Sequence, residues 1–260
     1  MRSMTSQSIF DVTGRVALVT GGSSGLGLQI ARVMVRAGAR VASVARTHDA
    51  AVCEALCSEA EEGCAPVFIC ADIRKQDEII KMFDAAEAAF GIVTILFNNA
   101  GVSEKQRAGK ITRDSWRDIM SVNMDGQFFT AQEAARRMME VKCEGSIINT
   151  ASILAQSAMR GTAAYSISKA AVTQMTRSLA LEWAAHRIRV NAIAPGWFPT
   201  RINAEFLGGL GGDFIRSQNP MKRLGGAGDL DGAALLLASD ASRYMTGTVL
   251  TIDGGQSLVS

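Results

Sequence analysis

The sequence predicts an α/β fold of the Rossmann-like, doubly wound type, with a seven-stranded parallel sheet and helices on both faces. Short apolar runs alternate with longer segments of helical periodicity, which is typical of βαβ units. The apolar runs are nearly continuous in Val, Ile and Leu, as expected of strands that helices cover on both sides. A glycine-rich turn between the first strand and the first helix is the third observation.

The first strand is expected at residues 15–20 and the first helix at residues 28–37, where Gly38 ends it. Residues 20–27 between them read Thr-Gly-Gly-Ser-Ser-Gly-Leu-Gly. Glycines let a backbone approach a pyrophosphate closely, and a helix N-terminus offers free N–H groups and a positive dipole. The segment therefore predicts a dinucleotide-binding loop, with a turn that holds no ligand as the alternative.

The end of the second strand, expected at residues 41–44, bears on the choice of dinucleotide. An acid there would bond the ribose 2′-hydroxyl of NAD(H), whereas an arginine accommodates the 2′-phosphate of NADP(H). The chain continues as Ala45-Arg46-Thr47, without an acid. This predicts a preference for NADP(H), with NAD(H) as the second choice; the alternative is that Arg46 is only solvated.

The alternation of strands and helices continues through the rest of the chain. Further strands are expected at residues 67–70, 93–97, 145–150, 188–193 and 248–252, and further helices at 51–61, 77–90, 115–140 (one or two), 163–185 and 229–239. We expect a flexible tail over residues 1–10 and a single domain over 11–260. The glycine-rich segment 196–228 interrupts the pattern and predicts a substrate lid, although disordered filler is an alternative.

Composition excludes several classes of function. The 27 basic residues are scattered and balanced by 25 acidic ones, so we expect no nucleic-acid partner. No apolar run reaches about eighteen residues, and the N-terminal segment lacks a secretory core, which favours a cytoplasmic protein without a membrane span. The five cysteines have only His48 and His186 as companions, so neither a metal site nor a disulfide is expected.

A tyrosine and a lysine four residues apart, Tyr165 and Lys169, would lie on one face of a helix. A tyrosine has an ordinary pKa of about 10, and a neighbouring cation is expected to lower it toward the pH at which a general acid works best. Ser152 follows an expected strand and could direct a hydroxyl to the same place. The alternative is a packed tyrosine beside a surface lysine.

Taken together, the motifs resemble those of the classical short-chain dehydrogenase/reductase family over roughly residues 10–255. That family's glycine loop corresponds to Thr20, Gly21, Gly25 and Gly27, and its Asn-Asn-Ala-Gly run to residues 98–101. Its Asn, Ser, Tyr and Lys correspond to Asn123, Ser152, Tyr165 and Lys169, and its Pro-Gly-x-x-x-Thr to Pro195, Gly196 and Thr200. The segment 195–201 resembles that of 3-oxoacyl reductases.

The resemblance implies roles for these residues. Tyr165 would protonate the substrate oxygen during reduction, Ser152 would hydrogen-bond that oxygen, and Lys169 would lower the tyrosine pKa and hold the nicotinamide ribose. Asn123 would position a water molecule in a proton relay. Ile193 would lie near the middle of the cofactor. The residues expected at the cofactor are Gly21, Ser23, Ser24, Gly25, Leu26, Gly27, Arg46, Asp72, Ile73, Asn99, Ala100, Gly101, Tyr165, Lys169, Pro195, Gly196, Phe198 and Thr200.

The expected substrate pocket is largely apolar, which argues against a bare sugar. It would be lined by Ser152, Leu154, Met159, Tyr165, Trp197 and Phe206, with Phe198 nearby. Around the lid we also expect a basic set that could attract a phosphate-bearing carrier such as a carrier-bound acyl thioester, made up of Arg160, Arg201, Arg216, Lys222 and Arg223. Ordinary solvation of those side chains is the alternative.

The sequence thus favours an NADPH-dependent reductase that converts a small-molecule ketone or 3-oxoacyl carbonyl to a secondary alcohol. An NAD-dependent alcohol or hydroxysteroid dehydrogenase is the main alternative. A nucleotide-sensing regulator without catalysis and a purely structural subunit are less favoured, because the Ser, Tyr and Lys are all present. Resemblance to the family also implies a homotetramer, assembled through the helices at 115–140 and 163–185 and the last strand.

Overall fold

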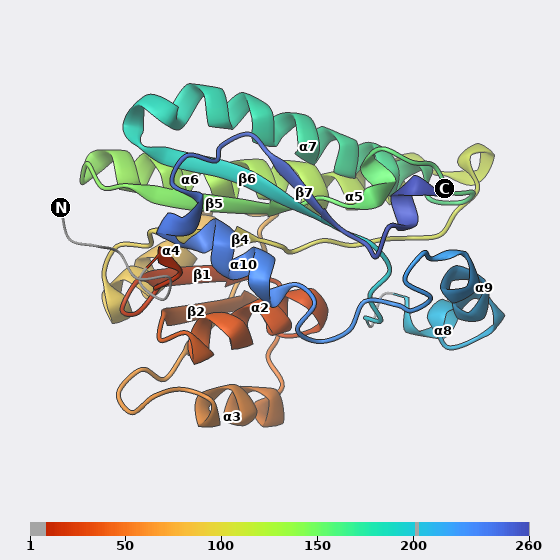
Figure 1. Cartoon of the computed structure of the whole chain (residues 1–260). Coiled ribbons are helices and arrows are strands. Elements are labelled where there is room, and N and C mark those ends of the chain that lie inside the picture. The colour runs from red at the N-terminus through yellow and green to blue at the C-terminus, as the bar shows by residue number, and fades with distance from the viewer. Residues whose placement is uncertain (1–8, 201–202, 260) are drawn as a thin grey trace.

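A seven-stranded, wholly parallel sheet forms the centre of the computed structural model, which describes residues 9–200 and 203–259. The strand order is β3-β2-β1-β4-β5-β6-β7 (Figure 1), so the predicted fold class is confirmed. Most of the tail expected at residues 1–10 lies outside the described residues. The strands are β1 (Val16–Thr20), β2 (Arg40–Ala45), β3 (Val67–Cys70), β4 (Ile95–Asn98), β5 (Gly145–Thr150), β6 (Ile188–Pro195) and β7 (Val249–Ile252).

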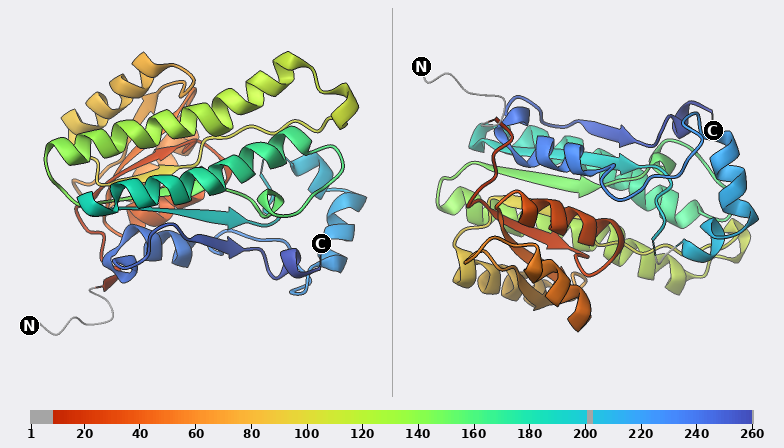
Figure 2. Two further views of the ribbon diagram at one scale, coloured as in Figure 1. Left: turned by 90° about the horizontal axis from the view of Figure 1, so that it is seen from above. Right: turned by 60° about the horizontal axis from the view of Figure 1, so that its bottom comes forward.

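Helices cover both faces of the sheet (Figure 2). One face packs against α4, α6 and α7, and the other against α2, α3 and α10. The helices are α2 (Gly25–Arg36), α3 (Ala50–Ser58), α4 (Gln76–Phe90), α5 (Arg113–Met120), α6 (Gln127–Glu140), α7 (Ala163–Trp183), α8 (Ala204–Leu207), α9 (Leu210–Gln218) and α10 (Asp231–Ala238). None of those in the described ranges has the length and hydropathy that a membrane crossing needs.

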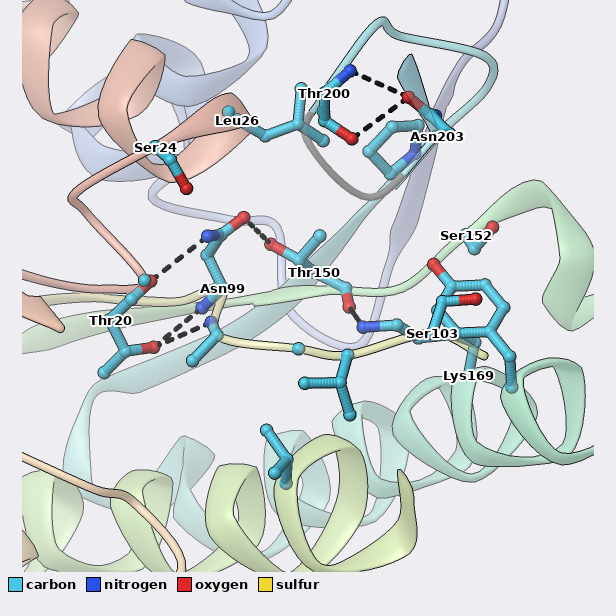
Figure 3. Close-up of a pocket in the computed structure, with 18 of the residues that line it drawn as sticks. Thr20, Ser24, Leu26, Asn99, Ser103, Thr150, Ser152, Lys169, Thr200 and Asn203 are labelled. Carbon is cyan, nitrogen blue, oxygen red and sulfur yellow. Dashed lines mark hydrogen bonds between the residues drawn. The ribbon is translucent and has the colours of Figure 1, made fainter. Parts of the chain in front are cut away.

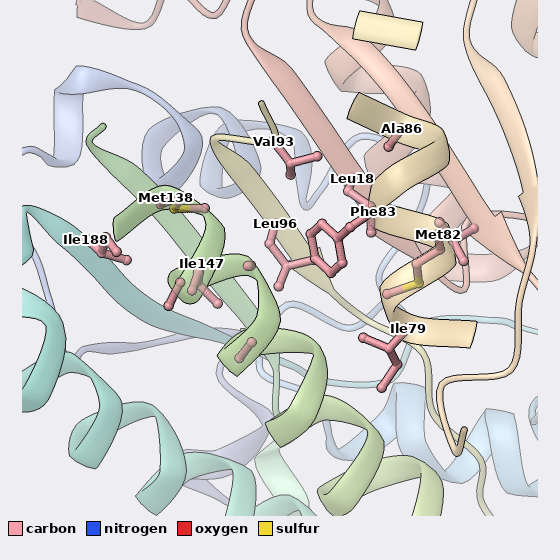
Figure 4. Packing of buried hydrophobic residues seen from close by; sticks show 14 of the residues in the cluster. Leu18, Ile79, Met82, Phe83, Ala86, Val93, Leu96, Met138, Ile147 and Ile188 are labelled. Carbon is pink, nitrogen blue, oxygen red and sulfur yellow. The ribbon is translucent and has the colours of Figure 1, made fainter. Parts of the chain in front are cut away.

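The core consists of two apolar layers, one on each face of the sheet. In the layer shown in Figure 4, Met82 and Phe83 of α4 and Met138 of α6 pack against Leu96 and Ile147 of the central strands. Each of these side chains is almost completely buried, and such burial stabilises a fold by about 1.5–3 kcal/mol per large apolar residue. The strands lie between the two layers, with their carboxyl ends at one edge.

Two helices differ from the expectation. Helix α2 begins at Gly25 rather than at residue 28, so the last glycines of the loop form its first turn. The segment expected as one or two helices at 115–140 is α5 and α6 joined by a π-helical segment, Ser121–Gly126. The spacing of apolar residues did not predict this change of winding. An added Cβ on Gly126 would lie 2.8 Å from Cγ1 of Ile73, so that position has no room for a side chain.

The strand order creates a crevice at the carboxyl edge of the sheet. Strand β2 pairs with one side of β1 and β4 with the other, so the direction in which strands are added reverses at β1. Ligands of doubly wound folds bind at such a switch point. The segment predicted as a lid, residues 196–228, contains α8 and α9 between β6 and α10 and lies beyond this edge (Figure 1).

A buried arginine ties two neighbouring helices of one layer, α4 and α6, together. Arg137 of α6 is 9% exposed, and its guanidinium bonds Glu133 of the same helix and Asp84 and Glu87 of α4, each at 2.7 Å. Its neighbour Arg136 also bonds Glu133 but has an exposed side chain. Arg137 is therefore the arginine that links α6 to α4.

Replacing Arg137 with Ala is expected to lower the free energy of unfolding by about 2–4 kcal/mol, because it removes one partner of buried charges. The Arg136→Ala variant is the matched control and should lose about 0–1 kcal/mol, since its side chain is half exposed. Urea denaturation of both variants measures the difference. Equal losses would contradict the assignment of Arg137 as the link.

Candidate active site

A cavity of about 490 Å³ lies at the carboxyl edge of the sheet. Its walls are the segments that follow six of the strands, β1 to β6, together with residues of α7 and of the predicted lid. All the predicted cofactor and substrate residues line this cavity except Gly27 and Ile193, and the predicted catalytic residues line it except Asn123. Figure 3 shows part of the wall.

The glycine loop brings backbone to the cavity at the start of α2. Gly25 has φ +55°, a left-handed conformation that glycine adopts without strain. The N-terminus of α2 has no side-chain cap and no acid in its first turn, so its N–H groups and positive dipole are available to an anion. Gly27 has a packing role instead: an added Cβ would lie 2.2 Å from the carbonyl oxygen of Gly21.

Two arginines mark the end of the cavity beyond β2 and β3. Arg46 follows β2 and is exposed. Arg74, which was not predicted from the sequence, forms an ion pair with Asp72, and its hydrogen bonds lower the pKa of that carboxyl to about 2. Asp72, expected at the cofactor, is thus already engaged by a side chain. A second arginine two residues after Asp72 was the available signal.

A chain of hydrogen bonds runs across the strand ends to α7 (Figure 3). The Thr20 hydroxyl accepts from the backbone N–H groups of Asn99 and Ala100, each at 3.0 Å. The Asn99 amide donates to the Thr20 carbonyl at 3.1 Å and accepts from the Thr150 hydroxyl at 3.3 Å. The Thr150 carbonyl accepts from Nζ of Lys169 at 2.7 Å. These bonds fix the position of the lysine relative to the glycine loop.

Lys169 and Tyr165 lie on the same side of α7, as predicted. The ammonium is 5.8 Å from the centroid of the tyrosine ring and 3% exposed, and burial lowers its pKa to about 8. Burial also raises the pKa of Tyr165, while interaction with the Ser152 hydroxyl acts in the opposite direction. The net shift is opposite to the one expected from the lysine alone, because removing water from the phenolate outweighs the other influences.

Ser152 lies two residues beyond β5, the strand-end position that was expected. It is 8% exposed, and its hydroxyl accepts a hydrogen bond from the Leu154 N–H at 3.1 Å. The same hydroxyl forms a hydrogen bond with the hydroxyl of Tyr165. Two hydroxyls therefore converge on one point of the cavity wall, next to the buried cation, and could both bond a single substrate oxygen.

Asn123 is placed behind the cavity rather than on its wall. It lies in the π-helical segment and is fully buried. Its side-chain oxygen accepts from the Val102 N–H at 2.8 Å, and its amide nitrogen donates to the Val102 carbonyl at 2.9 Å and to the Ser168 hydroxyl at 3.0 Å. The side chain thus braces the segment after β4 against α7. Ile193 is likewise buried in the core, away from the cavity.

The far end of the cavity has one apolar wall and one polar wall. Leu154, Met159, Trp197 and Phe206 form the apolar wall, and the rings of Trp197 and Phe206 are 5.8 Å apart. Four polar side chains that were not predicted also line the cavity, on segments whose spacing carries no motif: Ser103, Lys105, Thr162 and Asn203.

The basic set expected on the lid is mostly engaged with neighbouring groups. Arg216 pairs with Asp213, Arg223 pairs with Asp229, and Nζ of Lys222 donates to the Ser217 carbonyl at 2.7 Å. Arg201 lies outside the described residues. These pairings reduce the charge that the lid offers to a phosphate-bearing carrier.

Comparison with known proteins agrees with this arrangement. A family model described as Enoyl-(Acyl carrier protein) reductase matches residues 21–257. The chain is 34% identical to gluconate 5-dehydrogenase of Gluconobacter oxydans, over 97% of this chain and 98% of the relative. It is 36% identical to 3beta-hydroxysteroid dehydrogenase 1 of Eggerthella lenta, over 95% of each.

The fold also matches solved structures. A gluconate 5-dehydrogenase from Burkholderia cenocepacia, in complex with NADP and tartrate, superposes with a TM-score of 0.91 at 32% identity, over 98% of this chain and all of the other. The match of sequence and fold extends over almost the whole chain, and it includes the segments that form the cavity. The chain therefore belongs to the classical short-chain dehydrogenase/reductase family, and it is an oxidoreductase.

Proposed function

We propose that this oxidoreductase uses NADP(H) to interconvert a ketone and a secondary alcohol in a small molecule, with Tyr165 as the general acid and base. The observation that carries the proposal is the meeting of the Tyr165 and Ser152 hydroxyls beside the Lys169 ammonium, in the cavity that also receives the uncapped end of α2. Hydroxyl donors next to a buried cation suit an oxygen that gains negative charge during reduction.

The dinucleotide fits the donors along the cavity. The N-terminus of α2 would hold its pyrophosphate and Arg46 its 2′-phosphate, while Lys169 would reach the nicotinamide ribose. When bound, the cofactor supplies the hydride. In reduction, Tyr165 gives its proton to the substrate oxygen and Ser152 donates a hydrogen bond to it; in oxidation, the Tyr165 phenolate takes the proton from the alcohol.

NADP(H) is favoured over NAD(H) by the residues after β2. Ala45 stands where an acid would bond a ribose 2′-hydroxyl. Arg46 is exposed at the cavity, and no ion pair among the described residues occupies its guanidinium. The Burkholderia relative was crystallised with NADP, which agrees with this assignment.

The substrate class within this chemistry has more than one candidate. A gluconate dehydrogenase and a hydroxysteroid dehydrogenase are both similar to this chain, and an NAD-dependent alcohol or hydroxysteroid dehydrogenase is the alternative function. Reduction of a carrier-bound 3-oxoacyl thioester is less favoured, since Arg216 and Arg223 of the lid are paired with acids.

We also propose a homotetramer that buries part of α6 and α7. Both helices carry large apolar side chains that the single chain leaves exposed, with Phe129 43%, Ile167 49% and Leu181 83% exposed. Contact between copies of the chain would remove this apolar surface from water.

Replacing Tyr165 with Phe is expected to lower kcat/KM by about 10²–10⁴-fold, because the reaction loses its acid and base, while NADPH still binds. Activity is measured with NADPH or NADP⁺ on a panel of ketones and secondary alcohols, and NADPH binding by fluorescence titration. Tyr244→Phe is the matched control, since Tyr244 is the chain's other tyrosine and is fully exposed. Full activity of Tyr165→Phe would rule out the proposed mechanism.

The oxidative reaction should become faster with rising pH, because the phenolate of Tyr165 must accept a proton. Lys169, with a pKa of about 8, is charged at neutral pH and favours that phenolate. Lys169→Met is therefore expected to move the midpoint of the profile of kcat/KM against pH to higher pH, measured at saturating NADP⁺. Lys81→Met removes an exposed charge on α4 and should leave the midpoint in place. An unchanged midpoint in Lys169→Met would contradict the role of the ammonium.

Exchanging Ala45 for Asp and Arg46 for Ser together is expected to lower the ratio of kcat/KM with NADPH to that with NADH by about a hundredfold. The variant loses a charge-assisted hydrogen bond and gains a repulsion toward the 2′-phosphate. Arg40→Ser is the control, because Arg40 begins the same strand at its opposite end. Preference of the unchanged protein for NADH would overturn the cofactor assignment.

A further inference from the structure

The walls of the cavity carry more positive than negative side chains. Four lining side chains are cationic, and one, Asp72, is a carboxylate. Asp72 is paired with Arg74, and Arg46 and Lys169 have roles in the proposed function. The fourth cation, Lys105, has none. It lies on the segment after β4, two residues beyond Ser103.

Lys105 belongs to the substrate end of the cavity. In the view of Figure 3, Ser103 is drawn on the side of Ser152 and Lys169 and away from Thr20 and Ser24. An added Cβ on Gly101, two residues before Ser103, would lie 3.5 Å from Nζ of Lys169. The N–H of Gln106, the next residue, donates to the Gly161 carbonyl at 2.9 Å, which ties this segment to the one that precedes Tyr165. The Lys105 ammonium sits 4.7 Å from the centroid of the Phe206 ring in α8. The segment that carries Lys105 therefore borders the residues that precede Tyr165, while the Lys105 side chain reaches Phe206 on the other side.

The charge of Lys105 is not neutralised by an acid. No ion pair among the described residues includes it, and its recorded partner is the face of an aromatic ring. An ammonium over a ring at an exposed site interacts more weakly than an ammonium bonded to a carboxylate. In addition, no acid lines the substrate end within the part of the chain that the structure describes. This end of the cavity therefore attracts an anion.

We propose that Lys105 binds a carboxylate of the substrate, so that the substrates are hydroxy acids and oxo acids rather than neutral alcohols and ketones. The inference rests on the proposed function, since it names the substrate class of the same site. The apolar wall of Trp197 and Phe206 would contact the carbon chain, while Ser152 and Tyr165 would hold the reacting oxygen. Lys105 acts as a specificity-determining residue in this arrangement.

Matched acids and neutral analogues test the proposal. Steady-state kinetics with NADPH or NADP⁺ would compare 4-oxopentanoate with 4-oxopentanamide and gluconate with glucitol. The unchanged protein should favour the acid of a pair, and Lys105→Met should lower the acid-to-neutral ratio of kcat/KM by about tenfold or more, mainly through KM. Lys105→Arg should keep much of the ratio. Lys110→Met is the control, since Lys110 is exposed, lies outside the cavity and carries the same charge.

The acid-to-neutral ratio of kcat/KM distinguishes a Lys105 that binds a carboxylate from a Lys105 that only packs against the lid. If Lys105 only packs on Phe206, its loss would slow both members of a pair equally, and this outcome would overturn the proposal. A pair in which the neutral member is preferred by the unchanged protein would overturn it as well.

If no pair is turned over with either nicotinamide, the proposed function fails on this panel, and carboxylate binding is judged separately. Calorimetric titration of tartrate into the protein with NADPH should then show binding that weakens at least tenfold in Lys105→Met. Equal binding, or none, in both proteins would sink the inference.

Discussion

Hydrogen bonds that join the carboxyl ends of three strands to α7 hold the site together. Thr20 at the end of β1, Asn99 after β4 and Thr150 at the end of β5 bond one another in sequence, and the Thr150 carbonyl holds the Lys169 ammonium. Because these groups are largely shielded from water, an unpaired one would be costly, and the bonds therefore fix the distance between the glycine loop and the catalytic helix. The two halves of the proposed reaction, cofactor and proton donor, depend on that distance.

Burial sets the pKa values of the proposed catalytic pair, Tyr165 and Lys169. A lysine that is 3% exposed and a tyrosine beside it both lose solvation of their charged forms, so the lysine pKa falls to about 8 and the tyrosine pKa rises. A neutral phenol held beside a charged ammonium is suited to donating a proton to a carbonyl oxygen. The Ser152 hydroxyl, placed by β5, completes the set of donors.

Residues around the catalytic pair position the wall of the cavity in different ways. Asn123 has no access to the cavity, yet its side chain joins Val102 to Ser168 and so positions the segment that carries Ser103 and Lys105. The π-helical winding at Ser121–Gly126 brings Asn123 to that place, as such windings do at functional sites. On the proposed lid, the ring of Phe206 contacts both Trp197 and Lys105.

The parallel sheet, the glycine loop and the shared face of Tyr165 and Lys169 could be predicted from the sequence, because they follow from periodicity and from short spacings. The match of motifs also predicted that Ser152 and the strand-end segments form one site. Only the folded chain shows that Arg74 engages Asp72, that Asn123 lies behind the cavity wall and that Lys105 contacts Phe206. These depend on contacts between residues far apart or on side-chain direction, and burial, which sets the net pKa shift of Tyr165, is a property of the packed whole rather than of any local pattern.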